Sequence, residues 1–314
     1  MASGVEVTPI GDQLAARVTG VDLALPLDEA VRDAIVAALD HYAVLVFGGQ
    51  PLTADQQVAL ARQFGPLDTE VQKARKFSYN RLGSEVLTDI SNVSRDGAVA
   101  GRVDRQTLMN IGNAFWHSDG SYQDRPFRYS MLSCITVASW GGETEFADLR
   151  AAYDALDDRT KALLADKTGT FWSPFNRLKL GIVDPPERLA LFPPVEWPMV
   201  RTHSGSGRKV LWVGHPLCRI SGMSIPEGRA LAAELLEHAT ARERVYTHGW
   251  TPGDLVMWDN RATLHRGRRF DLSERREMRR AGTMDDCRSL GELPGPANGD
   301  INGFLPTESV SDAA

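Results

Sequence analysis

The chain contains 314 residues, of which 42% are hydrophobic, 24% charged and 8% aromatic. These values are close to those of ordinary globular proteins, so they exclude a disordered chain, a collagen-like repeat and a disulfide scaffold. With 35 lysine and arginine residues against 41 aspartate and glutamate residues, the net charge is −6 at pH 7. Nothing in this overall charge favours nucleic acid or an anionic membrane as a partner.

The first predicted elements are a helix, a strand and a second helix. Apolar residues at helical spacing predict a helix over Asp28–Leu39, and the apolar run Ala43–Phe47 predicts a buried strand. Thr53 followed by Gln56 at the third position is a capping-box pattern, which predicts a helix near 54–63.

Short β-like segments dominate the later chain. A second capping-box pattern, Ser224 with Glu227, predicts a helix near 226–239. The predicted strands are Ser130–Val137, Lys209–Val213, Asp254–Trp258 and Met278–Met284. We therefore expect a mainly β fold with flanking helices, built as an antiparallel sandwich.

Residues 1–290 show no repeat or low-complexity block and are interpreted as one domain. Within it, about 70–115 and 168–200 lack clear periodicity, and long irregular segments of this kind often form lids. Residues 291–314 are rich in Gly, Pro, Asn, Ser and Asp, which is typical of a mobile tail.

The cysteines and the N-terminus bear on location. Cys134, Cys218 and Cys287 form no C-x-x-C pair and cannot all pair within one chain, which favours a reducing compartment. The start lacks the pattern of a signal peptide, and no stretch approaches the roughly 18 apolar residues of a membrane span. We expect a cytoplasmic protein with no membrane or nucleic-acid partner, and a homo-oligomer.

Two short strings carry candidate metal ligands. In the string around Trp116, His117 and Asp119 stand two positions apart, which would put both side chains on one strand face. From Gly253, a turn, an apolar strand and another turn would bring His265 back from a distant segment. Two histidines and one aspartate form the facial triad of non-heme Fe(II), which leaves positions free for oxygen chemistry, whereas a structural zinc would more often close its fourth site. The alternatives are a surface or hydrogen-bonded pair for His117 and Asp119, and for His265 a histidine satisfied inside a turn by neighbouring carbonyls.

An arginine pair suggests an acidic co-substrate. Fe(II) with two neutral histidines and one ionised aspartate keeps a positive charge, which attracts an anion. Downstream, Arg276 and Arg280 stand four apart, and a guanidinium fork binds a carboxylate bidentately. The alternative is a solvated strand whose arginines pair with Glu274 and Glu277.

The sequence resembles the Fe(II)- and 2-oxoglutarate-dependent taurine and 2,4-dichlorophenoxyacetate dioxygenases, and the phenoxyacetate branch in particular. The matching stretches are residues 44–52, 89–94, 116–119, 141–148, 200–209 and 255–261. The resemblance implies a double-stranded β-helix, or jelly roll, with its site at one mouth. It also implies that His117, Asp119 and His265 are the catalytic iron ligands.

The resemblance extends to the co-substrate and the reaction. Thr144 and Arg276 match residues that hold the distal carboxylate of 2-oxoglutarate, and Arg280 matches one near its proximal carboxylate. The implied reaction uses Fe(II), 2-oxoglutarate and O₂ to hydroxylate the carbon beside the ether oxygen of an aryloxyalkanoate. Its products are a phenol, an oxo acid such as glyoxylate, succinate and CO₂.

Substrate residues are suggested in the same way. Lys73 and His203 match positions that contact the carboxylate of an aromatic carboxylate substrate, and Arg201 lies nearby. The candidates for an aromatic wall are Phe171, Trp172 and Phe175, although an aromatic stripe is more often part of a core. The alternatives are the same chemistry on a sulfonate such as taurine or on another natural carboxylate, and a non-catalytic jelly roll that binds an organic acid.

Overall fold

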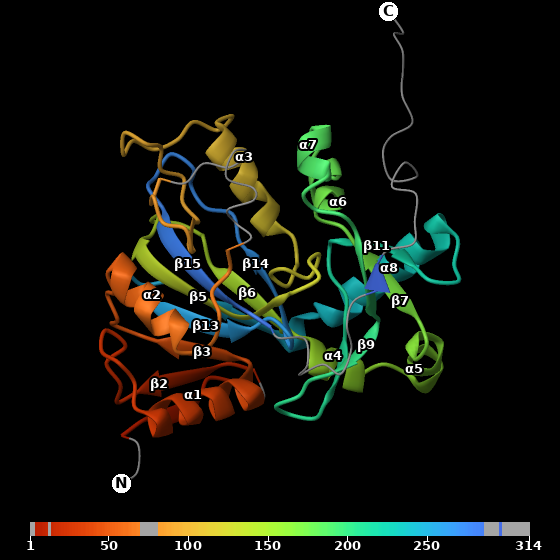
Figure 1. Ribbon diagram of the computed structural model, residues 1–314, viewed down its shortest axis with the longest axis horizontal. Coiled ribbons are helices and arrows are strands. Elements are labelled where there is room, and N and C mark those ends of the chain that lie inside the picture. The colour runs from red at the N-terminus through yellow and green to blue at the C-terminus, as the bar shows by residue number, and fades with distance from the viewer. Residues whose placement is uncertain (1–3, 12–13, 70–80, 286–294, 297–314) are drawn as a thin grey trace, which may run out of the picture.

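The computed structural model describes residues 4–11, 14–69, 81–285 and 295–296 (Figure 1). Lys73, part of the segment 70–115 and all of the tail 291–314 except residues 295–296 lie outside these ranges, so the predictions for them stay predictions. The described chain is mainly β with helices on the outside, as expected from the sequence. No helix in these ranges is both long and apolar enough to cross a membrane.

A seven-stranded sheet forms the centre of the molecule, in the order β1-β2-β3-β13-β5-β15-β4. Its strands are β1 (Glu6–Pro9), β2 (Ala16–Thr19), β3 (Val44–Phe47), β4 (Leu87–Asp89), β5 (Phe127–Thr136), β13 (Leu255–Asp259) and β15 (Glu277–Met284). All neighbours are antiparallel except β2 and β3. The middle strands β3 and β13 are almost wholly apolar, and β5 is buried over most of its length, because both faces of these strands are covered.

A three-stranded sheet, β12-β6-β14, packs against one face of the large sheet. Its strands are β6 (Thr144–Asp148), β12 (Val245–His248) and β14 (Thr263–Gly267). Phe146 of β6 meets Trp258 of β13 edge to face, with ring centroids 5.4 Å apart. The two sheets thus share one apolar core, in which Phe146, Trp258, Leu132 and Met278 are buried. This arrangement is the expected jelly-roll sandwich.

Helices α1 (Glu29–Tyr42) and α2 (Ala54–Arg62) lie along the large sheet (Figure 1). Ile35 and Leu39 of α1 and Leu60 of α2 are buried in the same core as Met131 and Met257 of the sheet. The predicted capping box of α2 is present in both directions, and the one predicted for α8 (Ile225–Ala239) is present as well. Local sequence signals therefore define these helices correctly.

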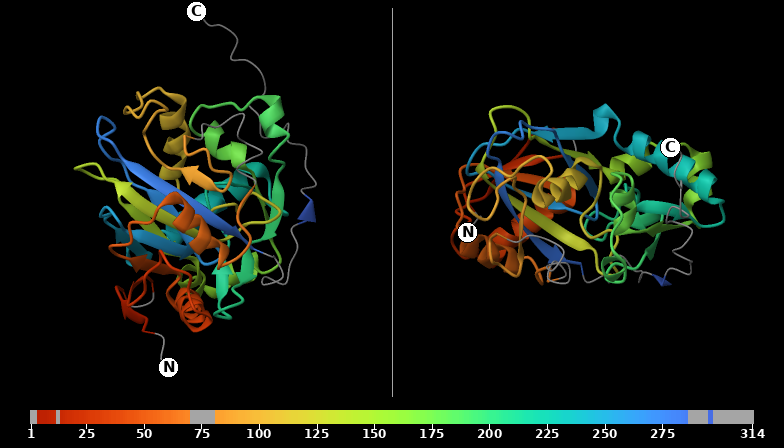
Figure 2. Two further views of the ribbon diagram at one scale, coloured as in Figure 1. Left: turned by 60° about the vertical axis from the view of Figure 1, so that its left-hand side comes forward. Right: turned by 90° about the horizontal axis from the view of Figure 1, so that it is seen from above.

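A second lobe lies beside the sandwich (Figure 2). It contains the sheet β11-β7-β8-β16, the pair β10-β9 and several helices. The bounds of its strands are β7 (Thr168–Phe171), β8 (Val195–Pro198), β9 (Val200–Thr202), β10 (Lys209–Leu211), β11 (Leu217–Ile220) and β16 (Gly295–Pro296). Its helices are α4 (Leu149–Asp154), α5 (Asp158–Leu164), α6 (Ser173–Leu178), α7 (Pro186–Leu189), α8 and η3 (Arg242–Arg244).

The segment 168–200 is more regular than the sequence suggests. It holds two paired strands, β7 and β8, and two short helices. The expectation of an irregular segment was wrong there, because these four-residue strands are stabilised by partners distant in sequence. Beside the sandwich, α3 (Arg105–Ile111) and η2 (Gly112–Ala114) precede the turn that carries His117.

Candidate active site

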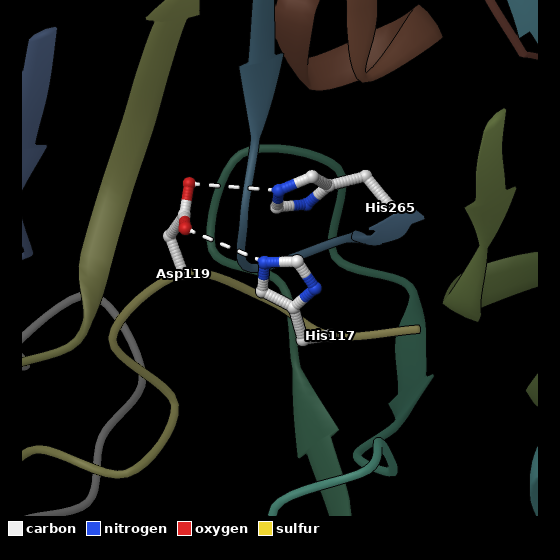
Figure 3. Close-up of side chains that lie close together, drawn as sticks. All are labelled: His117, Asp119 and His265. Carbon is white, nitrogen blue, oxygen red and sulfur yellow. Dashed lines mark ion pairs between the residues drawn. The ribbon is translucent and has the colours of Figure 1, made fainter. Parts of the chain in front are cut away.

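His117, Asp119 and His265 lie close together, and both imidazole rings face the carboxylate of Asp119 (Figure 3). The backbones of His117 and His265 form an isolated antiparallel bridge, with N–H to O=C distances of 3.1 and 2.8 Å. This bridge places the two imidazole rings side by side, with centroids 4.2 Å apart. His117 Nε2 lies 3.8 Å from Asp119 Oδ1, and His265 Nε2 lies 3.7 Å from Asp119 Oδ2.

These distances are too long for hydrogen bonds, so Asp119 is not hydrogen-bonded to either histidine. The ligand atoms nevertheless all lie within 4.8 Å of one another. The ring of His265 packs against Trp258, at 4.7 Å between centroids, and its Nδ1 has no hydrogen-bond partner within the described ranges. A histidine satisfied by turn carbonyls is therefore not what the structure shows.

The protonation states suit a metal ion. His117 Nδ1 lies 2.7 Å from the carbonyl oxygen of Phe115, so this nitrogen carries the hydrogen and Nε2 turns a lone pair toward Asp119. Burial lowers the pKa of His117 and His265, which keeps both neutral. Burial alone would raise the pKa of Asp119, but the positive charge of Arg280 above all lowers it, to about 2. The nitrogen lone pairs of two neutral histidines and the ionised carboxylate of Asp119 thus face one point, and a divalent cation fits this donor set.

A cavity of about 510 Å³ opens beside His265. The residues predicted to hold 2-oxoglutarate, Thr144, Arg276 and Arg280, all line it. Arg280 comes from β15 and forms an ion pair with Asp119 Oδ1. The structure therefore brings together the triad and all three candidate co-substrate residues, although they come from four separate segments of the chain, namely 117–119, β6, β14 and 276–280.

Arg276 is a buried cation at the cavity wall. Arg276 is only 8% exposed, and burial lowers the pKa of its guanidinium to about 10. Its Nη2 donates to the carbonyl oxygen of Gly142 at 3.0 Å, and its backbone N–H donates to Asn92 Oδ1 at 2.8 Å. No carboxylate of the described chain lies within ion-pair distance of it. A buried guanidinium without an anion is costly, so this wall is suited to receive one.

The hydroxyl of Thr144 is oriented by Trp250. The indole Nε1 of Trp250 donates to Thr144 Oγ1 at 3.0 Å. Because an indole can only donate, the Thr144 oxygen accepts, and its own hydrogen remains for an acceptor in the cavity. Trp250 was not identified from the sequence, since nothing local links it to a threonine on β6.

Arg201 and His203 lie elsewhere, and their predicted substrate role is not supported by their positions. Arg201 is 1% exposed, with its guanidinium 4.2 and 4.4 Å from the ring centres of Trp197 and Trp212. His203 is fully buried, and its Nε2 lies 3.0 Å from Asp259 Oδ2. Neither residue lines the cavity. Both are held in the interior by contacts that local sequence does not reveal.

The three aromatic residues predicted to form a wall of the substrate pocket do not line the cavity, and other aromatic residues do. Phe171 belongs to the core of the second lobe, and Trp172 and Phe175 form a small cluster with Cys218. The aromatic side chains that line the cavity are Trp140, Trp258 and Phe270. Helix α3 adds Ile111 to the same wall. These residues were missed because they come from a strand, a helix and loops that meet only in the folded chain.

Fold and site together define a class of protein. A jelly roll with a two-histidine, one-carboxylate set beside a cavity that contains a buried arginine has the architecture and donor set of non-heme Fe(II) oxygenases. The model of the family described as "Taurine catabolism dioxygenase TauD, TfdA family" matches residues 6–281. The chain belongs to this family.

Individual relatives agree with this assignment. The chain is 48% identical over 288 residues to an alpha-ketoglutarate-dependent 2,4-dichlorophenoxyacetate dioxygenase of Cupriavidus pinatubonensis, covering 90% of this chain and 99% of that protein. It is 35% identical to a (S)-phenoxypropionate/alpha-ketoglutarate-dioxygenase of Sphingobium herbicidovorans, covering 88% and 94%. A crystal structure of AAD-2 in complex with Mn(II) and N-oxalylglycine superposes with a TM-score of 0.83 at 42% identity, covering 90% and 98%.

Proposed function

We propose that this protein is an Fe(II)- and 2-oxoglutarate-dependent dioxygenase that hydroxylates the carbon beside the ether oxygen of an aryloxyalkanoate. The observation that carries the proposal is that the triad borders, through His265, the same cavity that Arg276 lines without a carboxylate partner. Relatives named for 2,4-dichlorophenoxyacetate and for phenoxypropionate support the substrate class. The expected cytoplasmic location and homo-oligomeric state stay predictions from the sequence.

Each side of the site has a distinct task. His117, Asp119 and His265 would hold the metal through two neutral nitrogens and one carboxylate. Arg276 and the Thr144 hydroxyl would bind the distal carboxylate of 2-oxoglutarate, and Arg280 would bind a carboxylate nearer the metal. When bound, Fe(II) supplies the oxygen activation that is coupled to oxidative loss of CO₂ from 2-oxoglutarate.

The reaction balances without a further reductant. The four electrons that reduce O₂ come from two sources, with two taken from 2-oxoglutarate as it becomes succinate and CO₂. The other two come from the carbon–hydrogen bond, which becomes a hydroxyl. The resulting hemiacetal breaks its bond to the aryl oxygen and releases a phenol and an oxo acid. The chain's part is to orient both acids and to exclude water, and the apolar walls of the cavity suit that part.

A mixed substrate panel tests this proposal. The purified protein is supplied with Fe(II), ascorbate, 2-oxoglutarate and O₂, and separately with an aryloxyacetate, each enantiomer of an aryloxypropionate, and taurine. We expect succinate and phenol in equal amounts from an aryloxyalkanoate. His117→Ala should abolish both products, whereas His41→Ala, which removes an exposed histidine of α1, should not.

Other outcomes of the panel would contradict the proposal in distinct ways. Sulfite from taurine with no phenol would mean that the chemistry is right and the substrate class is wrong. Binding of the organic acids with no succinate from any of them would identify a non-catalytic binder instead.

A further inference from the structure

Two buried residues that are not metal-ligand candidates hold Asp119 in place. Ser130 lies on β5, and Asn260 follows directly after β13. Both are fully buried, with 0% exposure. Together they contact Asp119 at its backbone and at its carboxylate, and neither contributes to the cavity wall.

The orientation of the Asn260 amide is fixed by its neighbours. Its Oδ1 accepts from the backbone N–H of Asp119 at 3.0 Å and from Trp258 Nε1–H at 3.0 Å. Both partners can only donate, so the oxygen must face them and the amide nitrogen must face the other way. That nitrogen, Nδ2, lies 3.0 Å from Ser130 Oγ.

The direction of the next hydrogen bond follows. Because Asn260 Nδ2 donates to the Ser130 oxygen, the single hydroxyl hydrogen of Ser130 is available for Asp119 Oδ2, at 2.7 Å. The chain of donors therefore ends on the carboxylate. It fixes the rotation of the carboxylate, whose two oxygens each face one histidine nitrogen.

We propose that Asn260 and Ser130 are the positioning residues of the metal site, which set the carboxylate of Asp119 for metal binding by one directed chain of hydrogen bonds. The inference rests on the proposed function, because it presumes that Asp119 is a metal ligand. Groups that orient a metal ligand change metal affinity by about 10- to 100-fold when they are removed. Without Ser130, the Asp119 carboxylate would keep Arg280 as its strongest fixed partner, and Arg280 lies on the cavity side.

The test measures binding of Mn(II), without 2-oxoglutarate, from the loss of the free-ion signal in electron paramagnetic resonance. We expect Ser130→Ala and Asn260→Ala each to weaken Mn(II) binding by about 10- to 100-fold. In the Ser130→Ala background, Asn260→Ala should cost less than it does alone, because part of its effect passes through Ser130.

Ser133→Ala is the matched control. Ser133 is on the same strand, is 3% exposed, and its hydroxyl has no hydrogen-bond partner in the described part of the chain. We expect this variant to bind Mn(II) as the native protein does. Thermal unfolding of the metal-free proteins distinguishes a positioning effect from a general loss of stability. We expect Ser130→Ala to lose Mn(II) affinity even when its unfolding temperature matches that of Ser133→Ala.

The outcomes distinguish the two proposals. If the native protein binds no Mn(II), or if His117→Ala binds it equally well, the proposed metal site is wrong. If binding is lost in His117→Ala but unchanged in Ser130→Ala and Asn260→Ala, only the inference is overturned. Should Asn260→Ala fail to fold, Ser130→Ala decides alone, because the proposed chain reaches the carboxylate only through its hydroxyl.

Discussion

At the scale of single residues, the buried guanidinium of Arg276 most strongly limits which ligands the cavity can bind, because it favours a carboxylate. Arg276→Lys keeps the positive charge but loses the two-pronged geometry that matches a carboxylate. Loss of one charge-assisted hydrogen bond, worth about 1.5 to 3 kcal/mol, corresponds to a rise of about 10- to 100-fold in the KM for 2-oxoglutarate. Succinate formation at varied 2-oxoglutarate concentration measures it.

Arg279→Lys provides the control from the same strand. Arg279 turns away from the cavity and donates to Gln57 Oε1 at 2.7 Å and to the Leu52 carbonyl at 2.7 Å. Its replacement should lower the free energy of unfolding and leave the KM for 2-oxoglutarate unchanged. Equal KM values for the native protein and Arg276→Lys would show that Arg276 does not bind the co-substrate.

The sequence allowed the ligand candidates to be named because their residue types and spacing carry chemistry. His117 and Asp119 are neighbours in sequence, and His265 stands after a turn. Ser130 and Asn260 carry no such signal, because an ordinary serine and asparagine become important only when strands β5 and β13 pair. For the same reason the sequence did not reveal that His203 is buried, because its partner Asp259 lies in a distant segment.

At the scale of elements, the Gly141–Gly142 turn before β6 shapes the co-substrate site. Gly142 has a φ of +82°, and a Cβ there would lie 2.9 Å from Nε of Arg276. Gly142→Ala should therefore displace the guanidinium as well as strain the turn. We expect the KM for 2-oxoglutarate to rise by about tenfold or less, together with a loss of stability.

A second glycine separates these two effects. Gly49 also has a positive φ, +67°, but nothing lies within 4 Å of its Cβ position. Gly49→Ala should cost about 1 kcal/mol of unfolding free energy by chemical denaturation and leave the KM unchanged. A KM equal to that of the native protein in Gly142→Ala would contradict the assigned role of this turn.

The elements that were predicted well are those defined by local signals. Helix α1 follows from apolar periodicity, strand β3 from its continuous apolar run, and α2 and α8 from their capping boxes. Strands β7 and β8 were not recognised, because neither is a continuous apolar run like β3, and their pairing with each other and with β11 joins segments far apart in sequence. Local periodicity is absent in such short strands.

At the scale of the whole molecule, the half-buried His215 makes stability depend on pH. Burial, and after it Lys179, His117 and Arg266, lower the pKa of His215 from 6.5 to about 3. Between these values the unfolded chain binds a proton that the native protein does not, so the free energy of unfolding falls as the pH falls. This contribution to stability is fully present above pH 6.5 and is lost progressively below it.

His215→Gln should make the decline less steep. Between pH 7 and pH 5, we expect the metal-free variant to lose about 1 to 2 kcal/mol less unfolding free energy than the native protein. Urea denaturation at the two pH values measures the difference. Parallel losses in the two proteins would mean that His215 is protonated equally in the folded and unfolded states.

The central claim is that one cavity holds a metal through His117, Asp119 and His265 and presents it to 2-oxoglutarate. Anaerobic addition of Fe(II) and 2-oxoglutarate tests this most directly, because Fe(II) and the keto acid held together in the site would absorb visible light by charge transfer. We predict a visible band in the native protein and none in His117→Ala. A pure, iron-loaded native sample without the band, or an undiminished band in His117→Ala, would contradict the account.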